Sequence, residues 1–547
     1  MRCYFLMAIM ALSLPLAVLA ATRSVCPDGS GDYVTIQAAI NASVNGDVIE
    51  LCDAIFSGDG NRDVDYLGKA ITVRSQSGNP QACIIDCGGN PHRGFYFHSG
   101  EGSSSLLEGV TIMGGSSVEG GGIHCAGASP TINDCILRGN FCRMGYGAGL
   151  FCTNCAPTLT GCSFIANGDG TETGGAGMAC VASSSPVLVS CTFETNRAQA
   201  GGGGLFCDAS SSPSLTACTF SGNVITAPNG YGGGLFCHSY SSPVLVDCVF
   251  SDNAAALGAG AAFFDHCDPS VTDCLFLENT SQNGGGAYFY YICLPVLDGC
   301  TFANNSAASY GGGLWCSASS PTLRSCTLSD NAAGIDGGGL HLYQSSPTLE
   351  QTIIAFSTSG TSVYCYGAGS TPLLTCCDVY GNAGGDWAGC IASQSGTGGN
   401  ISLDPLFCDA ANGDYGLESD SPCAPDYNPN CGLIGAWPTG CGGTGAVDDL
   451  PTDARPSLDA SPNPFTPGTR VTYVIPEDAQ QAPVLLSVFD ASGRLVRELL
   501  AVRQSAESGT VDWDGRDSAG ELVAAGMYFA QLSVGRDLVS RRLVRVR

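Results

Sequence analysis

Lysine is almost absent from this chain of 547 residues, and charged side chains of any kind are scarce. Lys69 is the one lysine, and 49 acidic residues face 21 basic ones, which gives a net charge of −28. Nearly all of this charge lies in residues 21–456, because acids and arginines almost balance in residues 457–547. Such a chain repels polyanions, which excludes nucleic acid as a partner and disfavours polyanionic pectin unless calcium bridges the two. The charge also serves to keep a long chain soluble.

Long apolar runs are missing too, except at the start of the chain. Residues 1–20 carry Arg2, an apolar run from Tyr4 to Leu19 and then Ala20, which predicts a secretory signal peptide. No later run approaches the length of about 18 residues that a membrane-spanning helix needs. We therefore expect an exported protein without a transmembrane segment.

A repeat of roughly 26 residues fills the middle of the chain. Each repeat opens on a proline, and eight of the prolines are followed by Cys five residues later and Asn ten residues later. The prolines are Pro130, Pro157, Pro186, Pro213, Pro243, Pro269, Pro295, Pro321 and Pro347. Changes in repeat length all fall between the Asn and the next glycine-rich step. Constant strands with one variable loop per turn indicate a solenoid.

Alternation within each repeat predicts which solenoid forms. Short runs alternate apolar with small or polar residues and are rich in β-branched and aromatic side chains. Cys218 and Phe220 share one face, whereas Thr219 points the other way. Parallel turns stacked about 4.8 Å apart would align such residues in ladders. We predict an all-β fold, a right-handed parallel β-helix of about 11–13 coils over residues 21–439, with regular repeats at 120–357.

Two short motifs recur at a fixed offset within these repeats. They are Gly-Gly-[Leu/Ile/Ala] and Phe-x-x-Asn, the second seen from Phe164 to Asn167 and from Phe220 to Asn223. The pair resembles the repeat of chlamydial-type polymorphic outer membrane proteins. This resemblance implies a surface-exposed β-helix used in adhesion.

The two ends of the solenoid have signatures of their own. Residues 35–40 predict a short amphipathic helix with Ile36, Ala39 and Ile40 on one side, inside an N-terminal cap at 21–51. This opening resembles pectin methylesterases and other pectate-lyase-like proteins, but the sequence blocks that carry catalysis in the esterases and polygalacturonases are missing. The resemblance therefore implies the fold alone. Residues 400–439 resemble the closing segment of secreted bacterial β-helix proteins and would add strands to the last turn.

A linker rich in Gly, Asp, Pro and Thr at 440–456 precedes an all-β module at 457–547. Its predicted strands are 470–475, 484–490, 494–500, 510–513, 526–534 and 538–546, with a hairpin turn at Ser492 and Gly493. The ordered motifs Asn-Pro-Phe, Phe-Asp-x-x-Gly-Arg-Leu-Val, Trp-Asp-Gly-x-Asp and Gly-x-Tyr resemble two related groups. These are the immunoglobulin-like domain of the flagellar hook-cap protein and the C-terminal sorting domain of type IX secretion. The second resemblance implies the outer-membrane secretion machinery as a partner; a plain structural module is the alternative.

All 31 cysteines precede residue 442. Export favours disulfides, yet the cysteines that follow the prolines face inward, where a thiol also packs as a small apolar group. We expect these ladder cysteines to be mostly packed thiols. The disulfide candidates are the off-ladder pairs Cys83/Cys87, Cys152/Cys155 and Cys423/Cys431.

Two outward columns of the solenoid are rich in aromatic residues. We predict that they form a ligand-binding face from Phe151, Phe206, Phe236, Tyr288 and Trp315, joined by Phe264 and Tyr290 in the second column. Exposed aromatic rings on a flat sheet stack against sugar rings or form an interaction patch. The alternative is that the rings pack under the variable loops.

A catalytic interpretation needs an acid and a base close together. Asp208, His238, Asp265 and His266 would meet on stacked turns, and Asp247 and Asp273 share another column. Asp252 and Glu278 share a third column and are candidates for Ca²⁺, although no cofactor is required by the sequence. Polysaccharide lyases of this fold generally pair bound calcium with a Lys or Arg base. Here Lys69 lies outside the regular repeats and the arginines do not cluster.

Together these patterns favour a secreted protein, or one attached to the bacterial cell surface or outer membrane through its C-terminal module, that acts in adhesion or glycan binding. Its partner would be a polysaccharide or a glycan on a host or neighbouring cell. The alternatives are a carbohydrate-active enzyme, lyase or hydrolase, with its site in turns 200–280, and a structural spacer of the cell envelope.

Overall fold

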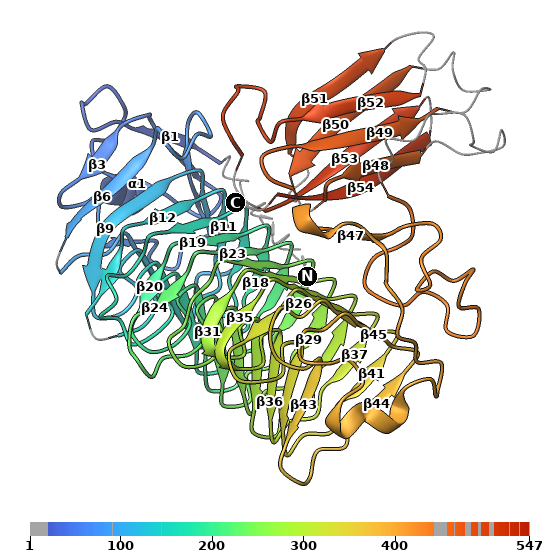
Figure 1. The fold of residues 1–547 in the computed structure, drawn as a ribbon. Coiled ribbons are helices and arrows are strands. Elements are labelled where there is room, and N and C mark those ends of the chain that lie inside the picture. The colour runs from blue at the N-terminus through green and yellow to red at the C-terminus, as the bar shows by residue number, and fades with distance from the viewer. Residues whose placement is uncertain are drawn as a thin grey trace, which may run out of the picture.

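In the computed structural model, the chain forms a long parallel β-helix followed by a small β-sandwich (Figure 1). The structure describes residues 20–89, 91–143, 145–441, 457–463, 465–475, 483–490, 494–502, 508–523, 526–534 and 537–545. Nearly all of the predicted signal peptide (1–20), most of the predicted linker (440–456) and the predicted turn at Ser492 and Gly493 lie outside the described residues. No helix in the described part of the chain is long and apolar enough to cross a membrane.

The β-helix makes about 13 turns, and each regular turn adds one strand to each of three parallel sheets, named A, B and C here. Sheet A contains β1 (Thr22–Val25), β2 (Val48–Leu51), β5 (Thr72–Ser75), β8 (Leu106–Glu108), β11 (Thr131–Asn133), β15 (Thr158–Thr160), β18 (Val187–Val189), β22 (Ser214–Thr216), β26 (Val244–Val246), β29 (Ser270–Thr272), β33 (Val296–Asp298), β37 (Thr322–Arg324), β41 (Thr348–Glu350) and β44 (Leu373–Thr375). Sheet B contains β3 (Ile55–Ser57), β6 (Ile84–Gly89), β9 (Thr111–Ser117), β12 (Ile136–Arg138), β16 (Ser163–Ile165), β19 (Thr192–Glu194), β23 (Thr219–Ser221), β27 (Val249–Ser251), β30 (Leu275–Leu277), β34 (Thr301–Ala303), β38 (Thr327–Ser329), β42 (Ile353–Ala355) and β45 (Asp378–Tyr380). Sheet C contains β4 (Val64–Asp65), β7 (Phe95–Phe97), β10 (Ile123–Ala126), β14 (Leu150–Thr153), β17 (Met178–Val181), β21 (Leu205–Cys207), β25 (Leu235–His238), β28 (Ala262–Asp265), β32 (Ala287–Tyr290), β36 (Leu314–Ser317), β40 (Leu340–Tyr343) and β43 (Val363–Tyr366).

Shorter elements occupy the corners and the ends. Between sheets B and C lie β13 (Phe141–Cys142), β20 (Arg197–Ala198), β24 (Val224–Ile225), β31 (Thr280–Asn283), β35 (Ser306–Tyr310) and β39 (Ala332–Ala333). The helices are α1 (Ile36–Ala42), η1 (Gly389–Gln394) and η2 (Ala410–Asn412). Near the end of the solenoid, β46 (Phe407–Asp409) pairs antiparallel with β47 (Asp414–Leu417).

The parallel register stacks like side chains on neighbouring turns, as the repeat predicts. Phe164, Phe193, Phe220, Phe250, Phe276 and Phe302 form one internal column, with ring centroids 4.4–5.0 Å apart and interplanar angles of at most 5°. These rings are completely or almost completely buried. Because each ring stacks on the next, the column forms a continuous hydrophobic core. The removal of each phenylalanine from water contributes on the order of 2 kcal/mol.

A ladder of buried asparagines lies where the chain leaves sheet B. Asn253 is typical: its Nδ2 donates to Phe220 O at 2.9 Å and to Asn279 Oδ1 at 3.0 Å. Its Oδ1 accepts from the backbone N of Asn223 at 3.0 Å and from Asn223 Nδ2 at 2.9 Å. The amide side chain therefore satisfies backbone groups that the corner removes from the sheet ladder.

The N-terminal cap has the predicted helix. Thr35 caps α1, with its hydroxyl accepting from Ala38 N at 3.4 Å, and the buried face consists of Ile36, Ala39 and Ile40. This face covers the first turn of the apolar interior, which an open solenoid would expose.

At the other end, the closing segment covers more than the last turn. Ile401 adds one bridge to the final strand of sheet B, but the chain then folds back along the outer face of that sheet. Trp437 Nε1 donates to Thr301 Oγ1 at 2.8 Å, and Ala436 N donates to Thr327 Oγ1 at 3.0 Å. The outward residues Val249, Leu275, Thr301, Thr327 and Ile353 are consequently buried. This stretch of sheet B is thus an internal interface and is unavailable to a ligand.

The C-terminal module is a sandwich of two antiparallel sheets. One contains β48 (Ser457–Ser461), β49 (Thr469–Val474) and β52 (Gly509–Trp513); the other contains β50 (Val484–Asp490), β51 (Leu495–Val502), β53 (Gly526–Val534) and β54 (Asp537–Arg545). All six predicted strands form, and β48 is additional. Trp513, Phe465 and Tyr528 pack together in the core of the module. The module lies over sheet B next to the closing segment (Figure 1), and Val544 packs with Tyr415 and Trp437.

Most cysteines are packed thiols, in agreement with the prediction for the ladders. Cys135, Cys162, Cys191, Cys218, Cys248, Cys274, Cys300 and Cys326 are free and buried. Burial raises the pKa of thiols such as Cys162 and Cys218 well above the ordinary value, which keeps them neutral and unreactive.

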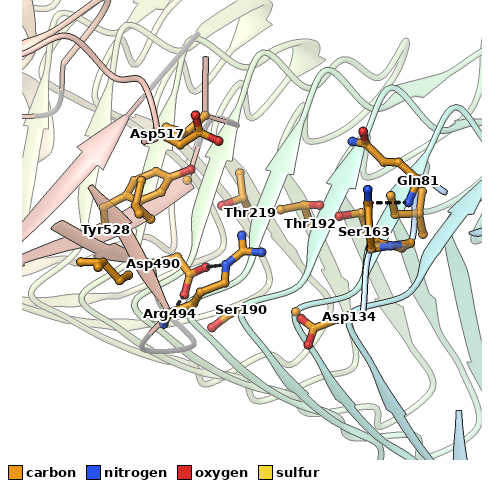
Figure 2. Close-up of a pocket in the computed structure, with 18 of the residues that line it drawn as sticks. Gln81, Asp134, Ser163, Ser190, Thr192, Thr219, Asp490, Arg494, Asp517 and Tyr528 are labelled. Carbon is orange, nitrogen blue, oxygen red and sulfur yellow. Dashed lines mark hydrogen bonds and ion pairs between the residues drawn. The ribbon is translucent and has the colours of Figure 1, made fainter. Parts of the chain in front are cut away.

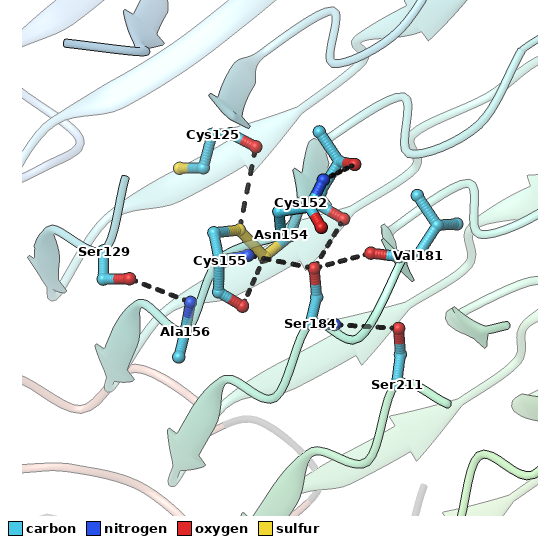
Figure 3. Close-up of a disulfide and its surroundings, with 10 residues drawn as sticks. Cys125, Ser129, Cys152, Asn154, Cys155, Ala156, Val181, Ser184 and Ser211 are labelled. Carbon is cyan, nitrogen blue, oxygen red and sulfur yellow. Dashed lines mark hydrogen bonds between the residues drawn. A yellow bond between two sulfur atoms is a disulfide. The ribbon is translucent and has the colours of Figure 1, made fainter. Parts of the chain in front are cut away.

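The disulfide predictions are correct for one pair and wrong for two. Cys152–Cys155 forms at the corner between sheets C and A (Figure 3), where Ser184 Oγ accepts from Cys155 N at 3.2 Å. Cys83 and Cys87 are free, and so is Cys423. Cys431 bonds Cys376 instead, and the further bridges are Cys365–Cys390 and Cys408–Cys441. For Cys431, nearness in sequence fails as a guide because the closing segment returns to distant turns.

Candidate ligand-binding site

The outer face of sheet C carries a row of aromatic side chains. Each strand from β7 to β43 places a ring in this row, except β17, which places Ala179 there. The members are Tyr96, His124, Phe151, Phe206, Phe236, Phe263, Tyr288, Trp315, His341 and Tyr364. Burial lowers the pKa of His124 and of His341 to about 4, so both imidazoles are neutral rings at neutral pH.

Neighbouring rings in the central part of the row pack edge to face and then stack. Phe236 is nearly perpendicular to Phe263, with centroids 5.1 Å apart and an angle of 75°. Phe263 meets Tyr288 at 88°, and Tyr288 stacks on Trp315 at 4.1 Å and 17°. These are the arrangements that the ring quadrupole favours, so the row is a defined surface rather than a set of loose side chains.

Glycines in a second column make room for these rings. Parallel bridges align Gly174, Gly201, Tyr231, Gly258 and Asn283 beside the row. A Cβ at Gly201 would lie 2.2 Å from Phe236 Cδ1, and a Cβ at Gly258 would lie 2.8 Å from Tyr231 Cδ1 and 2.9 Å from Tyr288 Cδ1. Tyr231 takes the space left by these glycines and packs on Phe263 at 4.5 Å. The glycine-rich step therefore shapes the aromatic face as well as the corner.

Rings and glycines together form an open groove of about 420 Å³. Its aromatic wall runs from Phe206 to Trp315, and the polar groups that line it are His238, Asp265 and Asn283 together with tyrosine side chains. The full lining is Phe206, Tyr231, Phe236, His238, Leu257, Phe263, Asp265, Asn283, Tyr288, Tyr290 and Trp315. Apolar walls with a few placed polar groups are typical of a ligand site.

The polar edge of the groove is a cluster that sequence reasoning predicts. His238 lies between two carboxylates, with Nδ1 3.1 Å from Asp208 Oδ1 and Nε2 3.3 Å from Asp265 Oδ2. Asp265 also contacts His266, whose Nδ1 lies 2.6 Å from Oδ1, and Ser239 Oγ lies 2.7 Å from His238 Nδ1. These five residues lie at or just after the ends of neighbouring strands of sheet C, where the parallel register aligns His238 with Asp265.

The predicted ligand-binding residues fall into three groups. Phe236, Tyr290 and Trp315 line the groove and are partly accessible. Phe206 and Tyr288 also line it, but they are 7% and 6% exposed, so they mainly support their neighbours. Phe151 is 4% exposed and lies outside the groove, packed with Ala179 and Phe206. These buried rings therefore pack mainly against their neighbours in the row.

Phe264 is the one residue placed on the wrong face. It points inward, is 1% exposed and stacks on Phe289 in the core at 5.3 Å. The register pairs Phe236 with Phe263, and Phe264 with Cys237, so Phe263 is the outward residue. In this turn alanine replaces glycine at Ala261, directly before the inward Ala262, so the sequence does not mark which of the two alanines faces inward.

The sequence prediction missed four residues of the groove, which are Tyr231, Leu257, Phe263 and Asn283. Tyr231 stands five positions before Phe236, directly ahead of the glycine step, and the same offset separates Tyr310 from Trp315. This recurring offset could have predicted that Tyr231 lies beside the aromatic row.

The other acidic candidates lie at different corners of the coil. Asp247 and Asp273 follow β26 and β29 at the corner between sheets A and B, away from the sheet C cluster. Asp252 and Glu278 follow β27 and β30 at the corner after sheet B, where burial and the neighbouring Asp252 charge raise the pKa of Glu278. Among the described residues, no group of three or more His, Cys, Asp or Glu side chains is arranged to hold a metal ion.

A second hollow of about 690 Å³ lies where the C-terminal module meets sheet B (Figure 2). The β-helix contributes Ser163, Thr192 and Thr219, and the module contributes the ion pair of Arg494 with Asp490. This lining mixes polar with aliphatic side chains, and Tyr528 is the aromatic side chain among its residues. The groove on sheet C combines accessible aromatic faces with a titratable cluster and is therefore the candidate site.

Comparison with known proteins identifies the two parts of the chain. The family model described as the right-handed β-helix region matches residues 121–289 and 274–403, and the model of the FlgD Ig-like domain matches residues 462–537. A search of curated proteins finds no match to this chain. The C-terminal module is thus similar to an immunoglobulin-like domain, as its sequence motifs predict.

Among solved structures, pectate lyase Pel9A is similar at 12% sequence identity and a TM-score of 0.37, covering 77% of this chain and 96% of the lyase. Pectin methylesterase from carrot is similar at 11% identity and a TM-score of 0.25, covering 73% and 92%. At these scores neither structure bears on the chemistry of the groove. The β-helix model, in contrast, spans residues 121–403, more than half of the chain, so the protein belongs to the right-handed β-helix family.

Proposed function

We propose that the protein binds glycans through the groove on sheet C. The observation that carries the proposal is the row of aromatic side chains, in which Phe236, Tyr290 and Trp315 remain accessible beside polar groups. Sugar rings present apolar C–H faces and hydroxyl edges, and this combination matches an aromatic wall with a polar rim. The row repeats every ~4.8 Å along the sheet, so a chain of sugars lying along it would meet one side chain after another.

A role in adhesion follows from this binding. The N-terminal sequence predicts export, and the motifs of the C-terminal module resemble those of the type IX sorting domain. We propose that the module delivers the β-helix to the bacterial surface or releases it outside the cell, where the groove engages a polysaccharide or a glycan on a neighbouring cell. Immunolabelling of intact cells that express the chain with and without residues 457–547 tests this delivery.

The binding test compares variants on a broad panel of immobilised polysaccharides. Trp315→Ala combined with Phe236→Ala removes two accessible groove rings. Retention on the bound glycan should fall at least tenfold, since each lost ring removes a stacking contact worth on the order of 1 kcal/mol and about 1.4 kcal/mol corresponds to tenfold. Tyr427→Ala is the matched control, because Tyr427 is an exposed aromatic residue of the closing segment, outside the groove. Unchanged retention of the double variant, or no retention of the wild type on any glycan, would refute the proposal.

One observation favours a second function, glycan hydrolysis. His238 is held between Asp208 and Asp265 at the edge of the groove, and paired carboxyl groups flanking a sugar are the usual machinery of glycoside hydrolases. An assay for new reducing ends, run together with one for unsaturated products, separates hydrolase, lyase and binder. A hydrolase would lose product release in both Asp208→Asn and Asp265→Asn, whereas a binder would release no product from the glycan that it retains.

A further inference from the structure

Carboxylates lie at the groove, and Lys and Arg are missing from its described lining. Asp265 lines the groove, and Asp208 lies behind His238. The faces of the aromatic rings add their negative quadrupole potential on the same side. A net charge of −28 on the chain raises the local concentration of cations further.

At one end of the same aromatic row, by contrast, a ring face is covered by the side chain of Arg93. Its guanidinium lies over the ring of Tyr96 at 4.8 Å, with Nη1 2.6 Å from His124 Nδ1 and Nη2 donating to Ser117 Oγ at 2.7 Å. In this place the protein itself supplies the cation that an aromatic face attracts. In the central groove, none of the described lining residues is a Lys or Arg that could take this place.

Asp265 is positioned to meet a cation from outside. Its side chain is 16% exposed, and the two histidines hold one oxygen each, Oδ2 towards His238 Nε2 and Oδ1 towards His266 Nδ1. Those contacts fix the carboxylate at the end of β28, two residues from Phe263 and level with Tyr290 on the next strand. A carboxylate fixed beside several ring faces is the environment that stabilises an ammonium group.

We propose that the groove selects glycans whose sugars carry a protonated amine, that is, deacetylated amino-sugar polymers. The inference rests on the proposed glycan binding and names its substrate class. The amine would contact Asp265 and the faces of neighbouring aromatic rings, while the sugar rings stack on Trp315 and Phe236. The open, elongated shape favours a polymer over a small ammonium compound, because the aromatic row continues beyond the groove on both sides.

The test uses two hexamers that differ in a single group per sugar. Glucosamine hexamer and N-acetylglucosamine hexamer share a backbone, and isothermal titration compares their affinities for the full-length protein. We expect the amine form to bind at least tenfold more tightly, because its ammonium groups are attracted by the ring faces and by the Asp265 carboxylate; tenfold corresponds to about 1.4 kcal/mol. A trimethylated glucosamine hexamer, whose positive charge is permanent, should bind like the amine form.

Asp265→Asn should remove the preference for the amine, so that the two hexamers bind the variant with affinities within about twofold of each other. Asp298→Asn is the control, because it removes one exposed carboxylate from the outer face of sheet A. Equal affinity for the hexamers in the wild type, or a preference that survives Asp265→Asn, overturns the amine assignment while glycan binding stands. In a competition experiment, choline that displaces the glucosamine hexamer and the N-acetylglucosamine hexamer equally well also overturns the amine assignment. If no glycan of any class is retained, the proposed function itself fails.

Discussion

Removal of one rung from the asparagine ladder tests how the turns of the β-helix are held together. Asn253→Ala deletes four hydrogen bonds: two donated by Nδ2, to Phe220 O and Asn279 Oδ1, and two accepted by Oδ1 from Asn223. All of these groups are buried. At about 1 kcal/mol net for each bond, with more where a partner stays unsatisfied, the loss is on the order of 4 kcal/mol.

A solenoid unfolds by turns rather than in one step, so the assay must be local. Native-state hydrogen exchange of amides in the turns around 220–280 reports the opening free energy of those turns. A loss of about 4 kcal/mol predicts roughly 10³-fold faster exchange there and little change at the N-terminal cap. Asn133→Ala is the control, since Asn133 lies half-exposed on the outer face of sheet A. Less than tenfold acceleration in Asn253→Ala, or an equal effect in the control, would refute the ladder as a source of stability.

Two further predictions concern the groove and the closing segment. Gly201→Ala is compatible with the backbone, but its methyl group would lie 2.2 Å from Phe236 Cδ1 and displace that ring, so glycan retention should fall at least tenfold. Gly102→Ala is the control, because a methyl group there would lie in open space and retention should be normal. Equal retention of the two variants would contradict the role given to Gly201. Burial raises the pKa of Asp378 to about 7 despite hydrogen bonds from Leu403 N and Cys423 Sγ. The native state therefore holds a proton that the unfolded chain releases near pH 4, so stability is fully present below about pH 4 and falls as pH rises towards 7, by about 4 kcal/mol in all. Hydrogen exchange of the closing segment should show this slope in the wild type and lose it in Asp378→Asn; a slope that persists in the variant assigns it to another group.

The sequence predicts the β-helix well because the same pattern of residues recurs in every repeat. The proline, the inward cysteine and phenylalanine, and the asparagine recur at fixed offsets, so an error in one turn is corrected by the others. The prediction fails where a turn departs from that pattern. Ala261 and Ala262 stand where other turns have a glycine and then the inward residue, so the pattern places the alternation one residue out of register and puts Phe264 instead of Phe263 on the surface.

Contacts between distant parts of the chain were beyond the sequence. Trp437 reaches Thr301, and Cys431 bonds Cys376, but no periodicity relates the closing segment to the turns that it covers. The polar cluster at the groove could be predicted because its residues do follow the periodicity of the repeat. Asp208, His238 and Asp265 occupy equivalent positions of successive turns, and a parallel register places such positions side by side.

The most direct test of the central claim is a crystal structure of the full-length protein with the glycan that it retains. The account predicts sugar rings against Trp315 and Phe236 on sheet C, with an amine, where the glycan carries one, next to Asp265. A glycan bound instead in the hollow between sheet B and the C-terminal module, or on the face of sheet A, would contradict it.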